Sequence, residues 1–133
     1  MLRTLRILVV EDERGVRLLL KRVLEGAGAA VTAVATLEEA LAELERVAPD
    51  ALLSDIRMPG GDGYELIRRV RALPRDRGGH TPAIAISASV DEHEIPEILA
   101  AGFQRFIRKP FEAAEVRDAI VDVTRQQGSR PPC

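Results

Sequence analysis

The stretch Ile7-Leu8-Val9-Val10-Glu11-Asp12-Glu13 places four consecutive apolar residues directly before three acids. A short, unbroken apolar run is typical of a strand that is buried on both faces of a parallel sheet. Apolar residues at helical spacing follow from Val16 to Ala27, and Gly28 can end that helix. The stretch therefore predicts a buried strand, an acidic turn and an amphipathic helix.

The same strand-then-helix pattern recurs four more times. Apolar runs predict strands at 30–34, 51–54, 82–87 and 104–108, and helical spacing follows each run. Thr36 and Glu39 have the spacing of a capping box at the start of the second helix. Pro96 fits only a first turn, so the fourth helix is expected to begin near Glu94 or Ile95. Five such units predict an α/β fold with one doubly wound, five-stranded parallel sheet of order 2-1-3-4-5.

Composition narrows the class of protein. The 133 residues fit one domain, predicted at 1–126, with a flexible C-terminal tail at 127–133. Nineteen basic and 21 acidic side chains nearly balance, and aromatic residues are only 3%, which argues against nucleic-acid binding. The longest apolar runs are far too short to span a membrane, and no signal peptide is visible. The lone Cys133 fits a reducing compartment, so we expect a cytoplasmic protein.

Chemically active residue types follow the predicted strands. Glu11 and Asp12 come after the first strand, Asp55 after the third, Ser87 after the fourth and Lys109 after the fifth. In a 2-1-3-4-5 sheet these carboxyl ends surround one crevice. Clustered carboxylates need a cation, and hard oxygen ligands favour Mg²⁺ or Mn²⁺. We therefore expect phosphoryl transfer, with Asp55 as nucleophile and with Lys109 and Ser87 holding phosphoryl oxygens.

Four motifs in this order resemble the receiver domain of response regulators in two-component signal transduction. They are Ile7 to Glu13, Asp55-Ile56-Arg57-Met58-Pro59 with Asp62-Gly63, Ile86-Ser87-Ala88, and Lys109-Pro110-Phe111. The resemblance covers about residues 5 to 125. It implies a CheY-like, flavodoxin-like (βα)5 sandwich.

The resemblance also implies a role for each matching residue. Asp55 would take a phosphoryl group from a histidine kinase or a histidine phosphotransfer protein. Glu11 and Asp12 would serve the Mg²⁺ ion together with Asp55 and the backbone carbonyl of Arg57. Ser87 and Phe106 would form a switch pair, and the Lys109–Pro110 bond would be cis.

The implied output is a changed surface on the fourth helix, fifth strand and fifth helix, through which a partner is controlled. The same surface would support a monomer or a weak dimer, and the downstream effector is unknown. Such a protein is not an enzyme, beyond accepting its own phosphoryl group and removing it again. The sequence departs from the common pattern at Glu11, Ser87, Phe106, Gly61 and Pro96.

Several alternatives stay open on sequence grounds. Ser87 can be read as a polar strand end and Phe106 as a fixed core aromatic. Arg68, Arg69 and Arg71 are expected to form a solvated helix face rather than a nucleic-acid patch. The chain can be a stand-alone regulator or a receiver domain cut from a hybrid histidine kinase. It can also be a degenerate receiver that acts as an interaction module without phosphorylation.

Two other classes of protein are disfavoured. An aspartyl phosphatase of the haloacid-dehalogenase type carries a second acid two residues after its nucleophile, where this chain has Arg57. A flavodoxin binds phosphate at its first strand–helix loop. Here that loop holds the acids Glu11 to Glu13, which would repel phosphate unless a metal were present.

Overall fold

The five strands form one parallel sheet. The computed structural model describes residues 2, 4–57, 62–88 and 90–128. The strands are β1 (Arg6–Val10), β2 (Ala30–Val34), β3 (Ala51–Asp55), β4 (Ala83–Ser87) and β5 (Arg105–Arg108). Their order is β2-β1-β3-β4-β5, and every neighbouring pair is parallel. The predicted fold class and strand order are confirmed.

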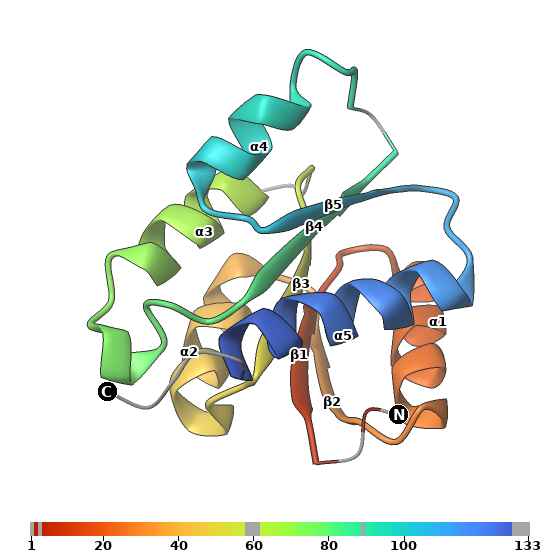
Figure 1. Cartoon of the computed structure of the whole chain (residues 1–133), viewed down its shortest axis with the longest axis horizontal. Coiled ribbons are helices and arrows are strands. Elements are labelled where there is room, and N and C mark those ends of the chain that lie inside the picture. The colour runs from red at the N-terminus through yellow and green to blue at the C-terminus, as the bar shows by residue number, and fades with distance from the viewer. Residues whose placement is uncertain (1, 3, 58–61, 89, 129–133) are drawn as a thin grey trace.

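Helices connect the strands and cover both faces of the sheet (Figure 1). They are α1 (Arg14–Gly26), α2 (Leu37–Val47), α3 (Gly63–Arg71), α4 (Ile95–Ala101) and α5 (Ala113–Gly128), with a short 3-10 turn at Arg75–Arg77. The side chains of α1 and α5 pack with one set of strand residues, and those of α2, α3 and α4 pack with the other set. Neighbouring residues of one strand, such as Ile7 and Leu8, therefore belong to different cores.

Complete burial explains the unbroken apolar runs. Four residues of β1 and all five residues of β3 and β4 are buried. The outer strands β2 and β5 are only partly buried. A central strand covered by helices on both sides needs apolar residues at every position rather than at alternate ones.

The helix starts follow the predicted caps with one difference. Thr36 Oγ1 accepts a hydrogen bond from the Glu39 N–H at 3.2 Å, as expected. The Glu39 carboxylate reaches back to the N–H of Ala35, not of Thr36, so the capping box is displaced by one residue. The helix that contains Pro96 begins at Ile95, which confirms the predicted start.

The C-terminal boundary differs slightly from the prediction. Helix α5 continues to Gly128, two residues past the predicted domain end at 126. Residues 129–133 lie outside the described part of the chain, so the flexible tail at 127–133 stays a prediction. In the described residues no helix combines the length and the apolar character that a membrane crossing needs.

Candidate phosphoacceptor site

Strand order reverses between β1 and β3, and acidic residues follow both strands. Val10 lies opposite Ser54 in the register of these two strands, so the next residues along the chain are Glu11, just after β1, and Asp55, the last residue of β3. In doubly wound sheets, ligands bind beyond the carboxyl ends of the strands at such a reversal. The predicted site residues on these two strands therefore lie at the predicted edge of the sheet.

Three carboxylates meet at this point. Carboxylate oxygens of Glu11, Asp12 and Asp55 all lie within 4.8 Å of one another. Glu11 is fully buried and Asp55 is 5% exposed, whereas Asp12 is exposed. Buried like charges at this spacing repel one another, and water screens them little. A positively charged group or ion would therefore strongly stabilise the cluster.

Lys109 supplies part of that charge from the end of β5. Its Nζ donates to Glu11 Oε1 at 2.7 Å and to Asp55 Oδ2 at 3.2 Å. Burial would lower the pKa of Lys109, but its hydrogen bond to Glu11 and the charges of Glu11 and Asp55 outweigh burial and raise it. Lys109 therefore stays protonated and bridges two of the three carboxylates.

Glu11 is the unusual titratable group of the site. Burial raises its pKa to about 7, although the hydrogen bonds from Lys109 and from the Glu13 N–H act in the opposite direction. Asp55 raises it further by charge repulsion. A carboxylate that is incompletely ionised near neutral pH must lose its proton before it binds a cation, so protons and cations compete for Glu11.

The backbone around Asp55 is closely packed. A Cβ atom added to Gly63 would lie 2.6 Å from the carbonyl oxygen of Asp55, so this position requires glycine. The Gly63 N–H also donates to the carbonyl of Ile56 at 2.9 Å. Glycine thereby brings the first turn of α3 directly against the end of β3. Gly61, Met58 and Pro59, also named in the sequence prediction, lie outside the described residues.

The two residues of the predicted switch pair lie on β4 and β5. Ser87, the last residue of β4, is 1% exposed. Phe106 of β5 is partly buried, and the guanidinium carbon of Arg108 lies 5.5 Å from its ring centroid. Arg108 also donates to the carbonyl oxygen of Val90, so it connects β5 to the segment before α4. The Lys109–Pro110 bond is cis, as the resemblance implied.

Two groups of hydrogen bonds, one around Glu94 and one around Arg71, were not predicted from the sequence. The Glu94 carboxylate accepts hydrogen bonds from Arg57 Nη2 at 2.5 and 2.6 Å and from the Tyr64 hydroxyl at 2.6 Å. Arg71 was wrongly assigned to a solvated helix face. Its guanidinium is partly buried and donates to the carbonyl oxygens of Gly79, Thr81 and Gly102.

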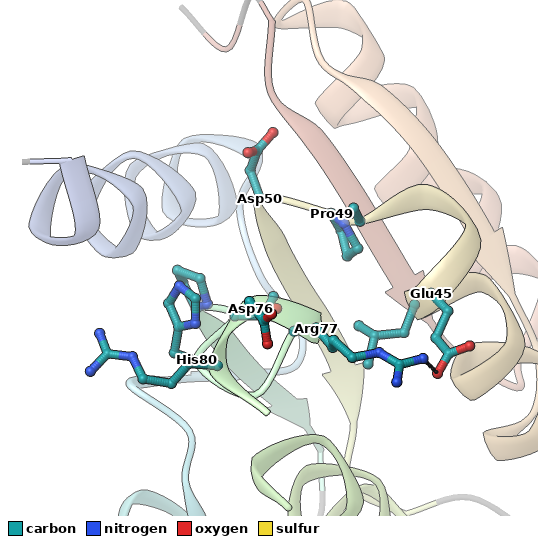
Figure 2. A pocket seen from close by; sticks show the side chains of 12 residues that line it. Glu45, Pro49, Asp50, Asp76, Arg77 and His80 are labelled. Carbon is teal, nitrogen blue, oxygen red and sulfur yellow. Dashed lines mark hydrogen bonds and ion pairs between the residues drawn. The ribbon is translucent and has the colours of Figure 1, made fainter. Parts of the chain in front are cut away.

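A hollow lies at the other end of the sheet. It has a volume of about 500 Å³ and is lined by the segment between α2 and β3 and by the residues before β4. Figure 2 shows acidic and basic side chains facing it together, with Arg77 paired to Glu45. Its charges are mixed and it lies at the amino ends of β3 and β4, so the acidic cluster is the better candidate for chemistry.

Comparison with known proteins assigns the family. The model of the response regulator receiver domain matches residues 7–121. The chain belongs to the response regulator receiver family. An uncharacterised 14.6 kDa protein of Leptolyngbya boryana is 44% identical over 110 residues, which are 83% of this chain and 82% of that protein.

Solved receiver structures have the same fold. A putative response regulator from Chloroflexus aurantiacus is 34% identical with a TM-score of 0.84, covering 91% of this chain and 98% of that one. The receiver domain of the sensor histidine kinase PA1611 from Pseudomonas aeruginosa is 32% identical with a TM-score of 0.81. The match covers 90% of this chain and 97% of that one. That structure has a magnesium ion coordinated in its active-site cleft.

Many relatives of this receiver are longer proteins. The chain spans 18% of the sensory/regulatory protein RpfC of Xanthomonas campestris and 54% of the regulator KdpE of Escherichia coli. Receivers thus occur both in sensory proteins and in transcriptional regulators. The family places this domain in two-component signalling.

The donor atoms of this receiver fit a magnesium ion. Three carboxylates lie close enough to share one cation, and Lys109 offsets only part of their charge. All the side-chain donors are hard oxygens, which Mg²⁺ prefers. The exposure of Asp12 leaves room for the water ligands that Mg²⁺ retains. Glu11, Asp12 and Asp55 are thus suited to hold the ion.

Proposed function

We propose that this receiver accepts a phosphoryl group on Asp55 from a phosphohistidine of a histidine kinase or a phosphotransfer protein. The observation that best supports this proposal is the position of Asp55. It ends β3, is nearly buried, contacts Lys109 through Oδ2 and shares a cation-sized site with two further acids. A bound Mg²⁺ or Mn²⁺ ion would neutralise charge on the carboxylates and on the incoming phosphoryl group.

In the proposed reaction, an Asp55 oxygen forms a bond to phosphorus while the bond from phosphorus to the histidine nitrogen breaks. The leaving nitrogen keeps the bonding electrons and the histidine is regenerated. Lys109 holds a phosphoryl oxygen by charge, and Ser87 donates a hydrogen bond to another. Water later attacks phosphorus, releases inorganic phosphate and restores Asp55. The domain acts on its own phosphoryl group only, so it is a switch rather than an enzyme.

The proposed output is a change at the surface of α4, β5 and α5. Ser87 ends the strand between Asp55 and Phe106, so its movement towards a phosphoryl group would leave space for the ring of Phe106. Arg105 and Asp122 form a 2.6 Å ion pair that joins β5 to α5 on this surface. Such a surface can control a protein partner or a weak dimer. The cytoplasmic location remains a prediction.

The direct test is the intact mass after incubation with acetyl phosphate, with and without Mg²⁺. One phosphoryl adduct that needs Mg²⁺ and is lost in Asp55→Asn would support the proposal. Asp50→Asn is the matched control, because Asp50 lies just before the opposite end of the same strand. A folded protein that takes no adduct would instead favour an interaction module that works without phosphorylation.

A further inference from the structure

One carboxylate joins the phosphoacceptor loop to the output helix. Glu94 lies at the start of α4, Arg57 follows β3, and Tyr64 lies in the first turn of α3. Their three hydrogen bonds are between 2.5 and 2.6 Å long, and we call these residues the Glu94 cluster. The Glu94 side chain is 17% exposed and the Arg57 side chain is 45% exposed, so water screens the pair mainly from the Arg57 side.

Glu94 makes these contacts instead of capping its own helix. It is the N-cap residue of α4, yet its side chain forms no cap hydrogen bond. Pro96 removes one backbone donor from the first turn, and Asp91 accepts the N–H of Glu94 at 3.1 Å. The start of this seven-residue helix therefore depends on side chains from two other elements.

Arg57 contacts the site through its backbone and the helix through its side chain. Its N–H donates to Asp55 Oδ1 at 3.2 Å, while its guanidinium holds Glu94. A ligand that draws the Asp55 carboxylate towards itself changes the acceptor of that N–H. The change reaches Glu94 through one residue, without passing through Ser87 or Phe106.

We infer that Glu94 is a positioning residue for the phosphoacceptor loop, and that the Glu94 cluster couples occupation of the acidic site to the start of α4. The nature of the ligand rests on the proposed function: a divalent cation, followed by a phosphoryl group on Asp55. Coupling between two sites is reciprocal. Loss of the Glu94 contacts must therefore change the affinity of the acidic site for Mg²⁺.

The fluorescence of Tyr64 can report changes in the Glu94 cluster. Tyr64 is the only tyrosine of the chain, and there is no tryptophan. Burial and the hydrogen bond to Glu94 raise the pKa of the Tyr64 hydroxyl. Tyrosine fluorescence is quenched when the hydroxyl donates to a carboxylate, so the emission of the native protein reports this one bond.

The experiment titrates Mg²⁺ and then acetyl phosphate into the native chain, Glu94→Gln and Glu97→Gln. The readouts are tyrosine emission, the Kd for Mg²⁺ and the phosphoryl adduct by intact mass. Glu97 is the matched control, because it is an exposed acid of the same helix that acts on Tyr64 only through charge. Arg57→Lys is a second variant that keeps the backbone and the charge but loses the forked guanidinium.

We expect the native emission to change with the same half-saturation as Mg²⁺ binding. Glu94→Gln should abolish that change and shift the Kd by about three- to tenfold. Arg57→Lys should shift the Kd in the same direction by a smaller factor, and Glu97→Gln should stay within about twofold. Circular dichroism of each variant confirms that the fold is retained.

The outcomes separate this inference from the proposed function. An adduct on Asp55 with unchanged Tyr64 emission would overturn the coupling and leave phosphoryl acceptance intact. A Mg²⁺-dependent emission change without any adduct would support the coupling and refute phosphoryl acceptance. Equal Kd values in Glu94→Gln and the native chain would overturn the positioning role, whatever the adduct shows.

Discussion

The raised pKa of Glu11 predicts that Mg²⁺ binding depends on pH within the physiological range. With a pKa of about 7, roughly one tenth of the Glu11 carboxyls are ionised at pH 6 and roughly nine tenths at pH 8. If the cation binds only the ionised form, its Kd falls by about tenfold over this interval. The physical cause is burial: Glu11 is fully buried and Lys109 compensates for it only in part.

Calorimetry in buffers of different ionisation enthalpy measures both the Kd for Mg²⁺ and the number of protons released on binding. At pH 6 we expect release of close to one proton for each Mg²⁺ bound, and at pH 8 of about a tenth of a proton. Glu11→Gln should bind Mg²⁺ more weakly and show almost no dependence on pH between 6 and 8. Asp50→Asn should keep the native profile. A native Kd that is constant from pH 6 to 8 would refute the reasoning from burial.

The same shift has a consequence for folding. The pKa of Glu11 is raised from an ordinary value of 4.5, so between pH 4.5 and about 7 the folded state binds more protons than the unfolded state. Without divalent cations, the Glu11 contribution to the free energy of unfolding therefore falls as the pH rises through this window. Urea denaturation in chelator should show this fall, and saturating Mg²⁺ should reduce it.

Three substitutions test other parts of the structure. Lys109→Gln leaves two buried carboxylates uncompensated and should lower the free energy of unfolding by about 1–3 kcal/mol in chelator; full native stability would contradict the pairing. Gly63→Ala should cost about 1–3 kcal/mol in urea denaturation because its Cβ meets backbone, whereas Gly15→Ala, with open space around it, should be neutral or stabilising. Arg71→Ala should lower the free energy of unfolding by about 2 kcal/mol and speed hydrogen exchange in the loops before β4 and β5, because these loops lose their hydrogen bonds to Arg71. Substitution of the exposed Arg69 by alanine should change the free energy of unfolding by no more than about 0.5 kcal/mol. Equal losses in the two variants would show that Arg71 does not stabilise these loops.

Most of the fold could be predicted from the sequence because its signals are local. An unbroken apolar run such as Ile7 to Val10 reports burial on both sides, and the proline at position 96 restricts where α4 can start. The site followed from topology: once the strand order is known, residues at strand ends such as Glu11 and Asp55 must converge. These inferences need chain order and periodicity but no distances between side chains.

The Glu94 cluster and the Arg71 contacts could not be predicted in this way. Arg57 and Glu94 are 37 residues apart, and their pairing depends on how α4 packs beside α3. Arg71 has the same local sequence context as its exposed neighbours Arg68 and Arg69. Only the positions of the carbonyl oxygens of Gly79, Thr81 and Gly102 distinguish it from them.

The acidic site and the Glu94 cluster have related electrostatics. In the first, three carboxylates lie together and one ammonium group bonds two of them, so the site is short of positive charge. In the second, one carboxylate is bound by a guanidinium and a hydroxyl, so its charge is well compensated. Arg57 belongs to both, through its N–H and its guanidinium. A cation bound at the first site would draw the Asp55 carboxylate away from the Arg57 N–H without weakening the guanidinium pair, so Arg57 and Glu94 should move together and the hydrogen bond from Tyr64 to Glu94 should change.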